Sequence, residues 1–240
     1  MNDNQIFERH EIKYLVDDRQ RAQLIQALRG RVRPDPHGES TICNVYYDTP
    51  DFRLIRRSLE KPVYKEKLRV RSYGPVRSEQ DVFLELKKKY RSVVYKRRIS
   101  LPEQAAEDFL RGGAPLPEDS QIGRELAYFL EFYGELVPAV HLSYDRTAFF
   151  AAEDPNLRLT FDQNIRWRTE DLTLTAQPGG QQILDRDQSL LEIKTGAAMP
   201  LWLAELLNEN DIRQVSFSKY GRAYQSLLQN KLQERGVFCA

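Results

Sequence analysis

Apolar and polar residues alternate with a period of two along several stretches of the chain, which is the spacing of a β-strand with one face in the core. The stretches that we expect to form strands are residues 6–16, 40–49, 63–73, 81–90, 92–101, 138–154, 157–171 and 189–196. Apolar residues three and four positions apart predict helices instead. We expect helices over residues 17–32, 51–61, 102–113, 120–136, 200–211 and 218–234.

The ends of some elements carry their own signals. Asp17 or Asp18 is expected to cap the first helix, because a short acidic side chain accepts hydrogen bonds from the free N–H groups of the first turn. Residues 154–156, Asp-Pro-Asn, are expected to form a turn between two strands. No repeat, low-complexity tract or linker divides the sequence. We therefore predict a single domain over residues 1–240, of the α+β class, with eight or nine mostly antiparallel strands and helices around them.

Composition narrows the class of protein. Apolar residues make up 41% of the chain and charged residues 30%, which is typical of a soluble globular protein. No run of about 18 apolar residues occurs, so no membrane span is expected, and the N-terminus lacks the pattern of a signal peptide. The two cysteines, Cys43 and Cys239, are far apart in the sequence. We predict no structural disulfide and a cytoplasmic location.

The net charge of +1 hides a strongly basic segment. Residues 51–98 contain 16 Lys and Arg against 6 Asp and Glu, so the rest of the chain is acidic. A basic segment in a nearly neutral chain favours a confined site for an anion over a diffuse surface for nucleic acid. No nucleic-acid partner is therefore expected.

The cations of residues 64–74, YKEKLRVRSYG, fall on every second position. Lys65, Lys67, Arg69 and Arg71 would stand in one row on one face of a strand, with no acidic residue of that strand among them. Leu68 and Val70 would point to the opposite face. The strand thus predicts one basic face and one apolar face.

Nearly every other expected strand also places charges on one face. These charges are Glu11, Lys13, Glu85, Lys87, Lys96, Arg98, Arg146, Arg158, Asp162, Glu192 and Lys194. A solvated face would explain any single strand, but solvated faces usually mix the two signs, because like charges on neighbouring strands are destabilising. Cations dominate here. The pattern favours a closed barrel whose charged lumen binds a ligand with several negative charges.

Nine segments occur in an order that is similar to a known family. They are HEIKYLV, YYDTPDF, KLRVR, FLELKKK, YKRRISL, SYDRTAFF, RLTFD, LLEIK and SFSKYGRAY. In this order they resemble the VTC (vacuolar transporter chaperone) domain of the triphosphate tunnel metalloenzymes, a superfamily that includes the CYTH proteins. The resemblance covers about residues 6–228.

The resemblance implies an eight-stranded antiparallel β-barrel, a tunnel that binds ATP, triphosphate or polyphosphate with a divalent metal, Mn²⁺ or Mg²⁺. In the VTC branch the γ-phosphoryl group of ATP passes to phosphate or to the end of a growing polyphosphate chain. The implied substrate-binding residues are Lys13, Arg69, Arg71, Lys87, Lys96, Arg98, Arg146, Arg158, Lys194, Ser218 and Lys219. The implied catalytic residues among them are Lys13, Arg69, Arg71, Lys87, Arg146 and Lys219. The implied metal ligands are Glu192, Glu11 and Glu85.

Two features qualify this expectation. Many tunnel enzymes begin with Glu-x-Glu-x-Lys, whereas this chain has Arg9-x-Glu11-x-Lys13, so an arginine replaces one metal-binding carboxylate. The change fits the VTC branch better than the hydrolytic branch and leaves the number of metal ligands open. Ser218 and Lys219 begin the last expected helix, where they either add to an anion site or only cap the helix.

Other functions are less consistent with the sequence, and two stay open. The three histidines lack zinc-site spacing, and no glycine-rich P-loop occurs. A tripolyphosphate or nucleoside triphosphate hydrolase would use the same cations with water as the acceptor. A non-catalytic polyphosphate-binding module would keep the cations without the metal ligands, and the presence of Glu11 and Glu192 argues against it.

Overall fold

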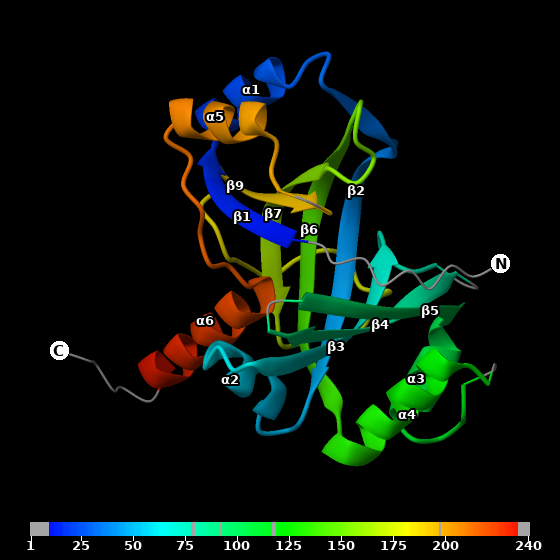
Figure 1. Ribbon diagram of the computed structural model, residues 1–240. Coiled ribbons are helices and arrows are strands. Elements are labelled where there is room, and N and C mark those ends of the chain that lie inside the picture. The colour runs from blue at the N-terminus through cyan, green and yellow to red at the C-terminus, as the bar shows by residue number, and fades with distance from the viewer. Residues whose placement is uncertain (1–9, 78–79, 92, 117–118, 197, 235–240) are drawn as a thin grey trace. The chain divides into compact units, whose positions relative to one another are not determined.

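The computed structural model describes residues 10–77, 80–91, 93–116, 119–196 and 198–234 (Figure 1). The strands are β1 (His10–Asp17), β2 (Val32–Asp48), β3 (Tyr64–Tyr73), β4 (Asp81–Tyr90), β5 (Val93–Pro102), β6 (Val137–Ala151), β7 (Arg158–Arg168), β8 (Gln181–Gln182) and β9 (Gln188–Thr195). The helices are α1 (Asp18–Ala27), α2 (Arg53–Leu59), α3 (Glu103–Leu110), α4 (Gln121–Tyr133), α5 (Leu201–Glu209) and α6 (Lys219–Glu234). The predicted α+β class is confirmed.

The strands form one hydrogen-bonded series in the order β1-β9-β7-β6-β2-β3-β4-β5, and β8 pairs only with β7. The pairs β1/β9, β3/β4, β4/β5, β7/β8 and β7/β9 are all antiparallel. The eight strands of the series correspond to the eight stretches that alternate in the sequence. The two-residue β8 is the ninth strand, and it is too short for an alternating pattern.

The expected closed barrel is not what the described residues form. A barrel needs every strand to pair on both sides. In the part of the chain that the structure describes, β1 and β5 end the series and do not pair with each other. The alternation of residues determines which face of each strand is apolar, but it does not determine whether the two edge strands meet. This is why the sequence could not settle closure.

The chain divides into two compact units, and neither is a continuous stretch of sequence. Unit 1 comprises residues 1–42, 144–165 and 184–217, and unit 2 comprises residues 43–143, 166–183 and 218–240. The strands β2, β6 and β7 each contribute to both units. The prediction of a single domain over residues 1–240 stays a prediction.

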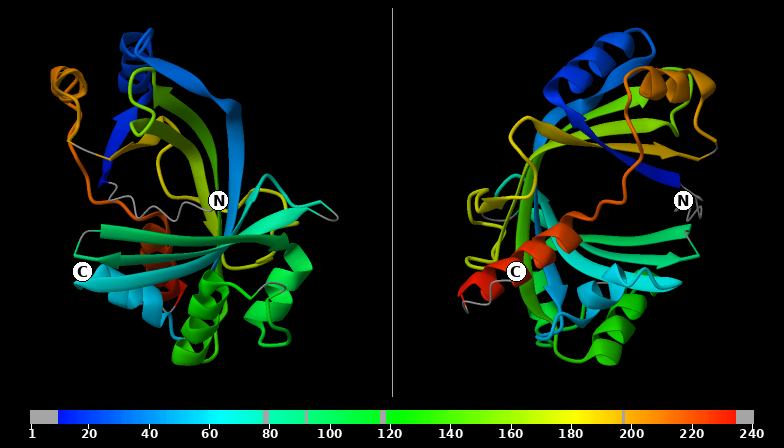
Figure 2. Two further views of the ribbon diagram at one scale, coloured as in Figure 1. Left: turned by 45° about the vertical axis from the view of Figure 1, so that its right-hand side comes forward. Right: turned by 90° about the vertical axis from the view of Figure 1, so that its left-hand side faces the viewer.

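The core of unit 2 lies between β3, β4 and β5 on one side and the helices α3 and α4 on the other (Figures 1 and 2). Leu68 and Val70 of β3 and Leu84 of β4 pack in it with Phe109 of α3 and Phe129 of α4. The predicted division of β3 is thus confirmed, because its apolar face packs against helices.

The core of unit 1 lies between β1, β9, β7 and the helices α1 and α5, which lie beside each other in Figures 1 and 2. Leu24 of α1, Leu203 of α5 and Phe161 of β7 are buried in it. The Asp17 carboxylate accepts a hydrogen bond of 2.7 Å from the N–H of Gln20 and so caps α1, as predicted.

The strand β2 begins at Val32, eight residues before the predicted start. Pro34, Pro36 and Gly38 lie in this early part, and proline and glycine normally argue against a strand.

The expected turn at residues 154–156 is confirmed by a hydrogen bond of 3.0 Å from the N–H of Leu157 to the carbonyl of Asp154. Within the described ranges, no helix has both the length and the apolar character needed to cross a membrane. Cys43 is buried, and Cys239 lies outside the described residues.

Candidate functional site

The cations predicted on β3 do share one face with charged residues of β4 and β5. Strand pairing places Lys67, Lys87 and Lys96 directly opposite one another across β3, β4 and β5. The neighbouring row on the same face is Arg69, Glu85 and Arg98. Like charges opposite each other are destabilising, so a row of three lysines is a site where an anion would be stabilising.

Glu85 is the centre of this basic face. Its side chain is 1% exposed, and its carboxylate lies 2.6 Å from Arg69 Nη2, 2.7 Å from Lys96 Nζ, 2.7 Å from Arg98 Nε and 3.9 Å from Arg71 Nε. Burial alone would raise the pKa of Glu85, but the neighbouring Arg69, Arg71 and Lys96 hold it far below its usual range. The carboxylate is therefore ionised and offsets part of the charge of four cations.

Neutral side chains orient the two arginines of β3. Arg69 Nη1 donates to the hydroxyl of Tyr46 at 3.0 Å, and Arg71 Nε donates to Oδ1 of Asn44 at 3.0 Å. Asn44 in turn donates to the carbonyl of Leu142 at 3.0 Å, and its side chain is fully buried. The guanidinium groups are thus held in place on several sides, which favours the binding of a ligand of fixed geometry.

The start of α6 joins the same face within unit 2. Lys67 Nζ donates to Ser218 Oγ at 2.8 Å, and the same oxygen accepts from the N–H of Gly221 at 3.0 Å. Ser218 therefore caps α6, as one of the two sequence interpretations expected, and also contacts the basic face. Lys219 is only 9% exposed.

Asp48 and Tyr220 link α2, α6 and the basic face, and the sequence did not reveal this. The buried carboxylate of Asp48 accepts from the N–H groups of Leu54 and Ile55 in α2, and from the hydroxyl of Tyr220 at 2.8 Å. The ring of Tyr220 stacks on Tyr46 with 4.6 Å between centroids. In the sequence, Asp48 comes at the end of a strand, before Thr-Pro, and this position alone indicates only the end of that strand. Asn44, which orients Arg71, was also not among the predicted site residues. The sequence does contain a signal for it, because Asn44 is a polar residue within a largely apolar strand.

Unit 1 holds a second charged cluster, centred on Glu192. Lys13 lies directly opposite Glu192 on the paired strands β1 and β9. Lys13 Nζ is 3.1 Å from a carboxylate oxygen of Glu11 and 3.6 Å from one of Glu192, and it donates to the carbonyl of Phe217 at 3.0 Å. Lys194 Nζ is 3.3 Å from Glu192.

Arg146 completes this cluster. Its guanidinium makes a two-pronged contact with Asp162, at 2.6 Å from Nε and 2.7 Å from Nη2, and Nη2 is 3.3 Å from Glu192. Burial would lower the pKa of Arg146, but Tyr144 and Asp162 raise it well above its usual value, so the cation is permanent. The sequence brought Asp162 to notice only as a strand charge, without a partner.

The remaining predicted residue, Arg158 of β7, lies directly opposite Lys194 of β9, beside the cluster of Glu192. Arg158 Nη2 is 2.9 Å from the carboxylate of Asp35, and its guanidinium lies 4.8 Å from the ring centroid of Phe150. Asp35 is buried in the early part of β2 that was not predicted as a strand. This partner was therefore missed.

The carboxylates predicted as metal ligands are divided between the two clusters. Among the described residues, no three His, Cys, Asp or Glu side chains gather into a metal-binding group. Glu11 and Glu192 are both within 4 Å of Lys13 Nζ, so each places a carboxylate oxygen, the donor that Mg²⁺ and Mn²⁺ prefer, beside the same cation. Glu85 belongs to the cluster of unit 2 and contacts four cations. Two of the three predicted ligands are thus brought together, and Arg9 lies outside the described residues.

The sequence model and the related proteins that match this chain all belong to one family. The sequence model of the VTC domain matches residues 8–228. The chain is 26% identical over 226 residues to vacuolar transporter chaperone complex subunit 4 of Trypanosoma brucei brucei, covering 78% of this chain and 28% of the relative. It is 24% identical over 237 residues to subunit 4 of the same complex in Schizosaccharomyces pombe, covering 81% of this chain and 33% of the relative. The chain therefore spans about a third of the length of these relatives.

Solved structures give the fold. A candidate adenylyl cyclase from Hippeastrum, reported to have a dominant triphosphatase activity, superposes with a TM-score of 0.55 at 19% identity, over 88% of this chain and 92% of that one. A candidate adenylate cyclase from Bacillus halodurans superposes with a TM-score of 0.53 at 17% identity, over 88% and 95% of the two chains. At these identities the likeness shows the fold.

Proposed function

Because the chain belongs to the VTC domain family, we propose that it is a polyphosphate polymerase-like phosphotransferase. It moves the γ-phosphoryl group of ATP to phosphate or to the end of a growing polyphosphate chain. Phosphoryl transfer of this kind depends mainly on the positioning of the phosphates and the neutralisation of their charge, without a covalent protein intermediate. Its alternatives are a tripolyphosphate or nucleoside triphosphate hydrolase and a non-catalytic polyphosphate-binding module.

One observation carries the proposal. Lys67, Lys87 and Lys96 stand opposite one another across three strands, beside the arginine row on the same face. Glu85 carries one negative charge and contacts four cations, so it does not neutralise this face by itself. A chain of phosphates supplies repeated negative charges with spacing short enough to contact successive cations. Arg recognises phosphate oxygens with two N–H groups, whereas Lys acts as a mobile point charge.

We assign the roles as follows for the two units. In unit 2 the phosphate-binding residues are Arg69, Arg71, Lys87, Lys96, Arg98, Ser218 and Lys219. In unit 1 they are Lys13, Arg146, Arg158 and Lys194. The proposed catalytic residues are Arg69, Arg71, Lys87 and Lys219 in unit 2 and Lys13 and Arg146 in unit 1.

A divalent metal, Mn²⁺ or Mg²⁺, is part of the proposal. Glu192 and Glu11 would hold it, because their carboxylates already approach the same cation, Lys13. When bound, such a metal neutralises charge on the phosphate oxygens, which serve as its further ligands. The contacts of Glu85 with four cations favour a charge-balancing role for this residue over metal ligation.

The experiment that tests the function is product analysis. The purified protein is incubated with ATP and Mn²⁺, and the products are separated on a polyacrylamide gel. A ladder of polyphosphate supports the polymerase, and its loss in the presence of EDTA supports the metal. Release of orthophosphate alone supports the hydrolase, which the reported triphosphatase activity of the Hippeastrum protein makes the second candidate. Tripolyphosphate binding without turnover supports the binding module.

A further inference from the structure

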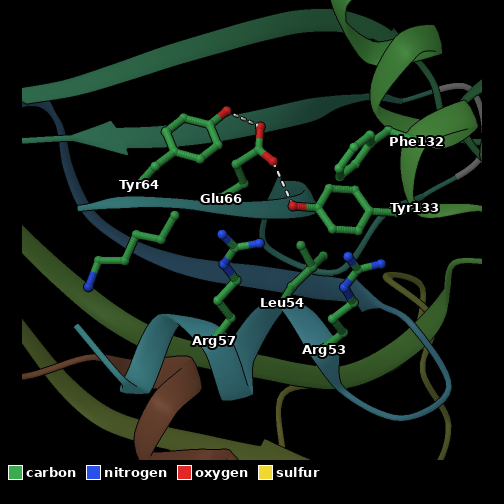
Figure 3. Close-up of a pocket in the computed structure, with 8 residues that line it drawn as sticks. Arg53, Leu54, Arg57, Tyr64, Glu66, Phe132 and Tyr133 are labelled. Carbon is green, nitrogen blue, oxygen red and sulfur yellow. Dashed lines mark hydrogen bonds between the residues drawn. The ribbon is translucent and has the colours of Figure 1, made fainter. Parts of the chain in front are cut away.

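A pocket in unit 2 lies on the face of β3 that is opposite to the basic face. It has a volume of about 160 Å³, and α2, β3 and the end of α4 form its walls (Figure 3). Tyr64, Lys65 and Glu66 of β3 line it, and Lys65 Nζ donates to the carbonyl of Ser58 at 3.2 Å. Glu66 alternates with Lys67 and Arg69 along the strand, so its carboxylate and these two cations point to opposite sides. No role proposed above uses this pocket.

The floor of the pocket is a buried carboxylate. Glu66 is 8% exposed, and its two oxygens accept hydrogen bonds from the hydroxyl of Tyr64 at 2.5 Å and from that of Tyr133 at 2.8 Å. Burial and the neighbouring Glu66 raise the pKa of both tyrosines, so both hydroxyls stay protonated and donate. Each oxygen of Glu66 keeps a second lone pair that can accept from a ligand. Within the described part of the chain, no Lys or Arg forms an ion pair with this carboxylate.

One wall of the pocket carries two cations. Arg53 and Arg57 are one turn apart on α2 and are exposed. Figure 3 shows the guanidinium group of Arg53 directed toward the rings of the opposite wall and that of Arg57 directed toward Glu66. Neither forms an ion pair with any carboxylate among the residues that the structure describes. Like charges one turn apart on a helix are destabilising, and an anionic group between them removes that cost. The planar guanidinium groups are suited to a phosphate.

The other wall is aromatic. The guanidinium carbon of Arg53 lies 5.5 Å from the ring centroid of Tyr133 and 6.0 Å from that of Phe132. Phe132 is 54% exposed, and its ring is stacked with the ring of Tyr128, which is 65% exposed. Large aromatic side chains with this exposure offer a surface on which a flat ring can stack.

We propose that this pocket binds a nucleotide. The phosphate lies between Arg53 and Arg57, the base stacks on the ring of Tyr133, whose hydroxyl contacts Glu66, and amino or imino groups of the base donate to Glu66. The ring of Phe132, at 85° to that of Tyr133, contacts the edge of the base. A guanine base presents two neighbouring donors to a carboxylate, so a guanine nucleotide is the preferred probe. The site is separate from the proposed phosphoryl-transfer site, because it lies on the other face of β3, and the proposal does not depend on that function.

The test measures the binding of GMP, UMP and inorganic phosphate to the protein by isothermal titration calorimetry, without any turnover. We expect GMP to bind at least tenfold more tightly than inorganic phosphate. The double variant Arg53→Ala/Arg57→Ala should weaken GMP binding at least tenfold, and Glu66→Gln should remove the preference for GMP over UMP. Both arginines are exposed, so the double variant is expected to fold, and circular dichroism checks this.

Two control variants distinguish GMP binding in this pocket from a general effect of positive charge on α2 and from binding at the basic face. Arg56→Ala removes a cation of the same helix that pairs with Asp51 and does not line the pocket, and it should leave GMP binding unchanged. Arg69→Ala changes the basic face and should also leave GMP binding unchanged. The proposal is overturned if the wild-type protein binds no nucleotide at millimolar concentration. It is equally overturned if Arg69→Ala abolishes GMP binding while Arg53→Ala/Arg57→Ala does not.

Discussion

Replacing Glu85 by Gln tests how the basic face is held together. The side chain keeps its size and loses its charge, and four cations within 4 Å lose their shared partner. Removing one partner of a buried ion pair typically costs about 3–5 kcal/mol. The side chains of Lys96 and Arg98 are 43% and 33% exposed, so water screens part of the repulsion. We therefore expect the free energy of unfolding to fall by about 3 kcal/mol, at the lower end of that range.

The assay is urea unfolding at neutral pH, followed by circular dichroism, with and without tripolyphosphate. Because the anion replaces the missing negative charge, tripolyphosphate should stabilise Glu85→Gln more than it stabilises the wild-type protein. Glu125→Gln is a matched control. Glu125 of α4 also contacts two cations of β4 and β5, Lys88 and Arg97, but it is 22% exposed. Its loss should cost about 1 kcal/mol or less.

If Glu85→Gln unfolds at the same urea concentration as Glu125→Gln, Glu85 does not hold the cations of the basic face together in the way described. A specific alternative result would be unchanged stability together with the loss of metal-dependent turnover. That result would make Glu85 a metal ligand, as the family resemblance implies, and would remove it from the charge balance of the basic face.

Three further predictions concern other residues. Arg69→Ala should lower tripolyphosphate affinity and ATP turnover more than tenfold, because a charge-assisted contact is worth about 1.5–3 kcal/mol. Lys65→Ala is the control and should change both quantities little. Equal losses in the two variants would contradict the prediction. Glu192→Gln should keep tripolyphosphate binding by calorimetry and abolish Mn²⁺-dependent turnover, and full activity would exclude Glu192 as the metal ligand. Burial, with a smaller contribution from Arg168, lowers the pKa of His141 to about 4 in the folded protein. The unfolded chain therefore takes up the proton first as the pH falls, and the wild-type protein should lose about 2 kcal/mol more stability between pH 7 and pH 5 than His141→Leu does. Parallel urea titrations at the two pH values measure the difference, and identical losses would refute it.

Much of the local structure could be predicted from the sequence, because it depends on neighbouring residues. The two faces of β3 follow from alternation alone, and the cap of α1 follows from Asp17 and Gln20. The early part of β2 could not be predicted, since Pro34 and Pro36 disfavour a strand by local rules and only its place in the sheet overrides them.

The partners of the predicted site residues could not be predicted, because they come from other strands. Arg69 is in a row without acidic residues on its own strand, and Glu85 lies opposite it only after β3 and β4 pair. The sequence therefore indicated repulsion where the structure has a cluster whose charge Glu85 partly offsets. An Arg69→Ala variant would lose this pairing as well as a like-charge repulsion, so the sequence gives no reliable sign for its effect on stability. Asp162 and Asp35 are partners of the same kind, because Asp162 of β7 contacts Arg146 of β6 and Asp35 of β2 contacts Arg158 of β7.

The three strands that both units share affect how the chain can fold and how it can be divided. Because β2, β6 and β7 each pass from one unit into the other, no single cut in the sequence releases either unit intact. The pairings β1/β9 and β2/β6 also join strands far apart along the chain, and such pairings form slowly because long loops must close before the contacts form. A fragment designed to carry only one of the two charged clusters would lack strands of its own sheet. Each cluster must therefore be studied by point substitution in the whole chain.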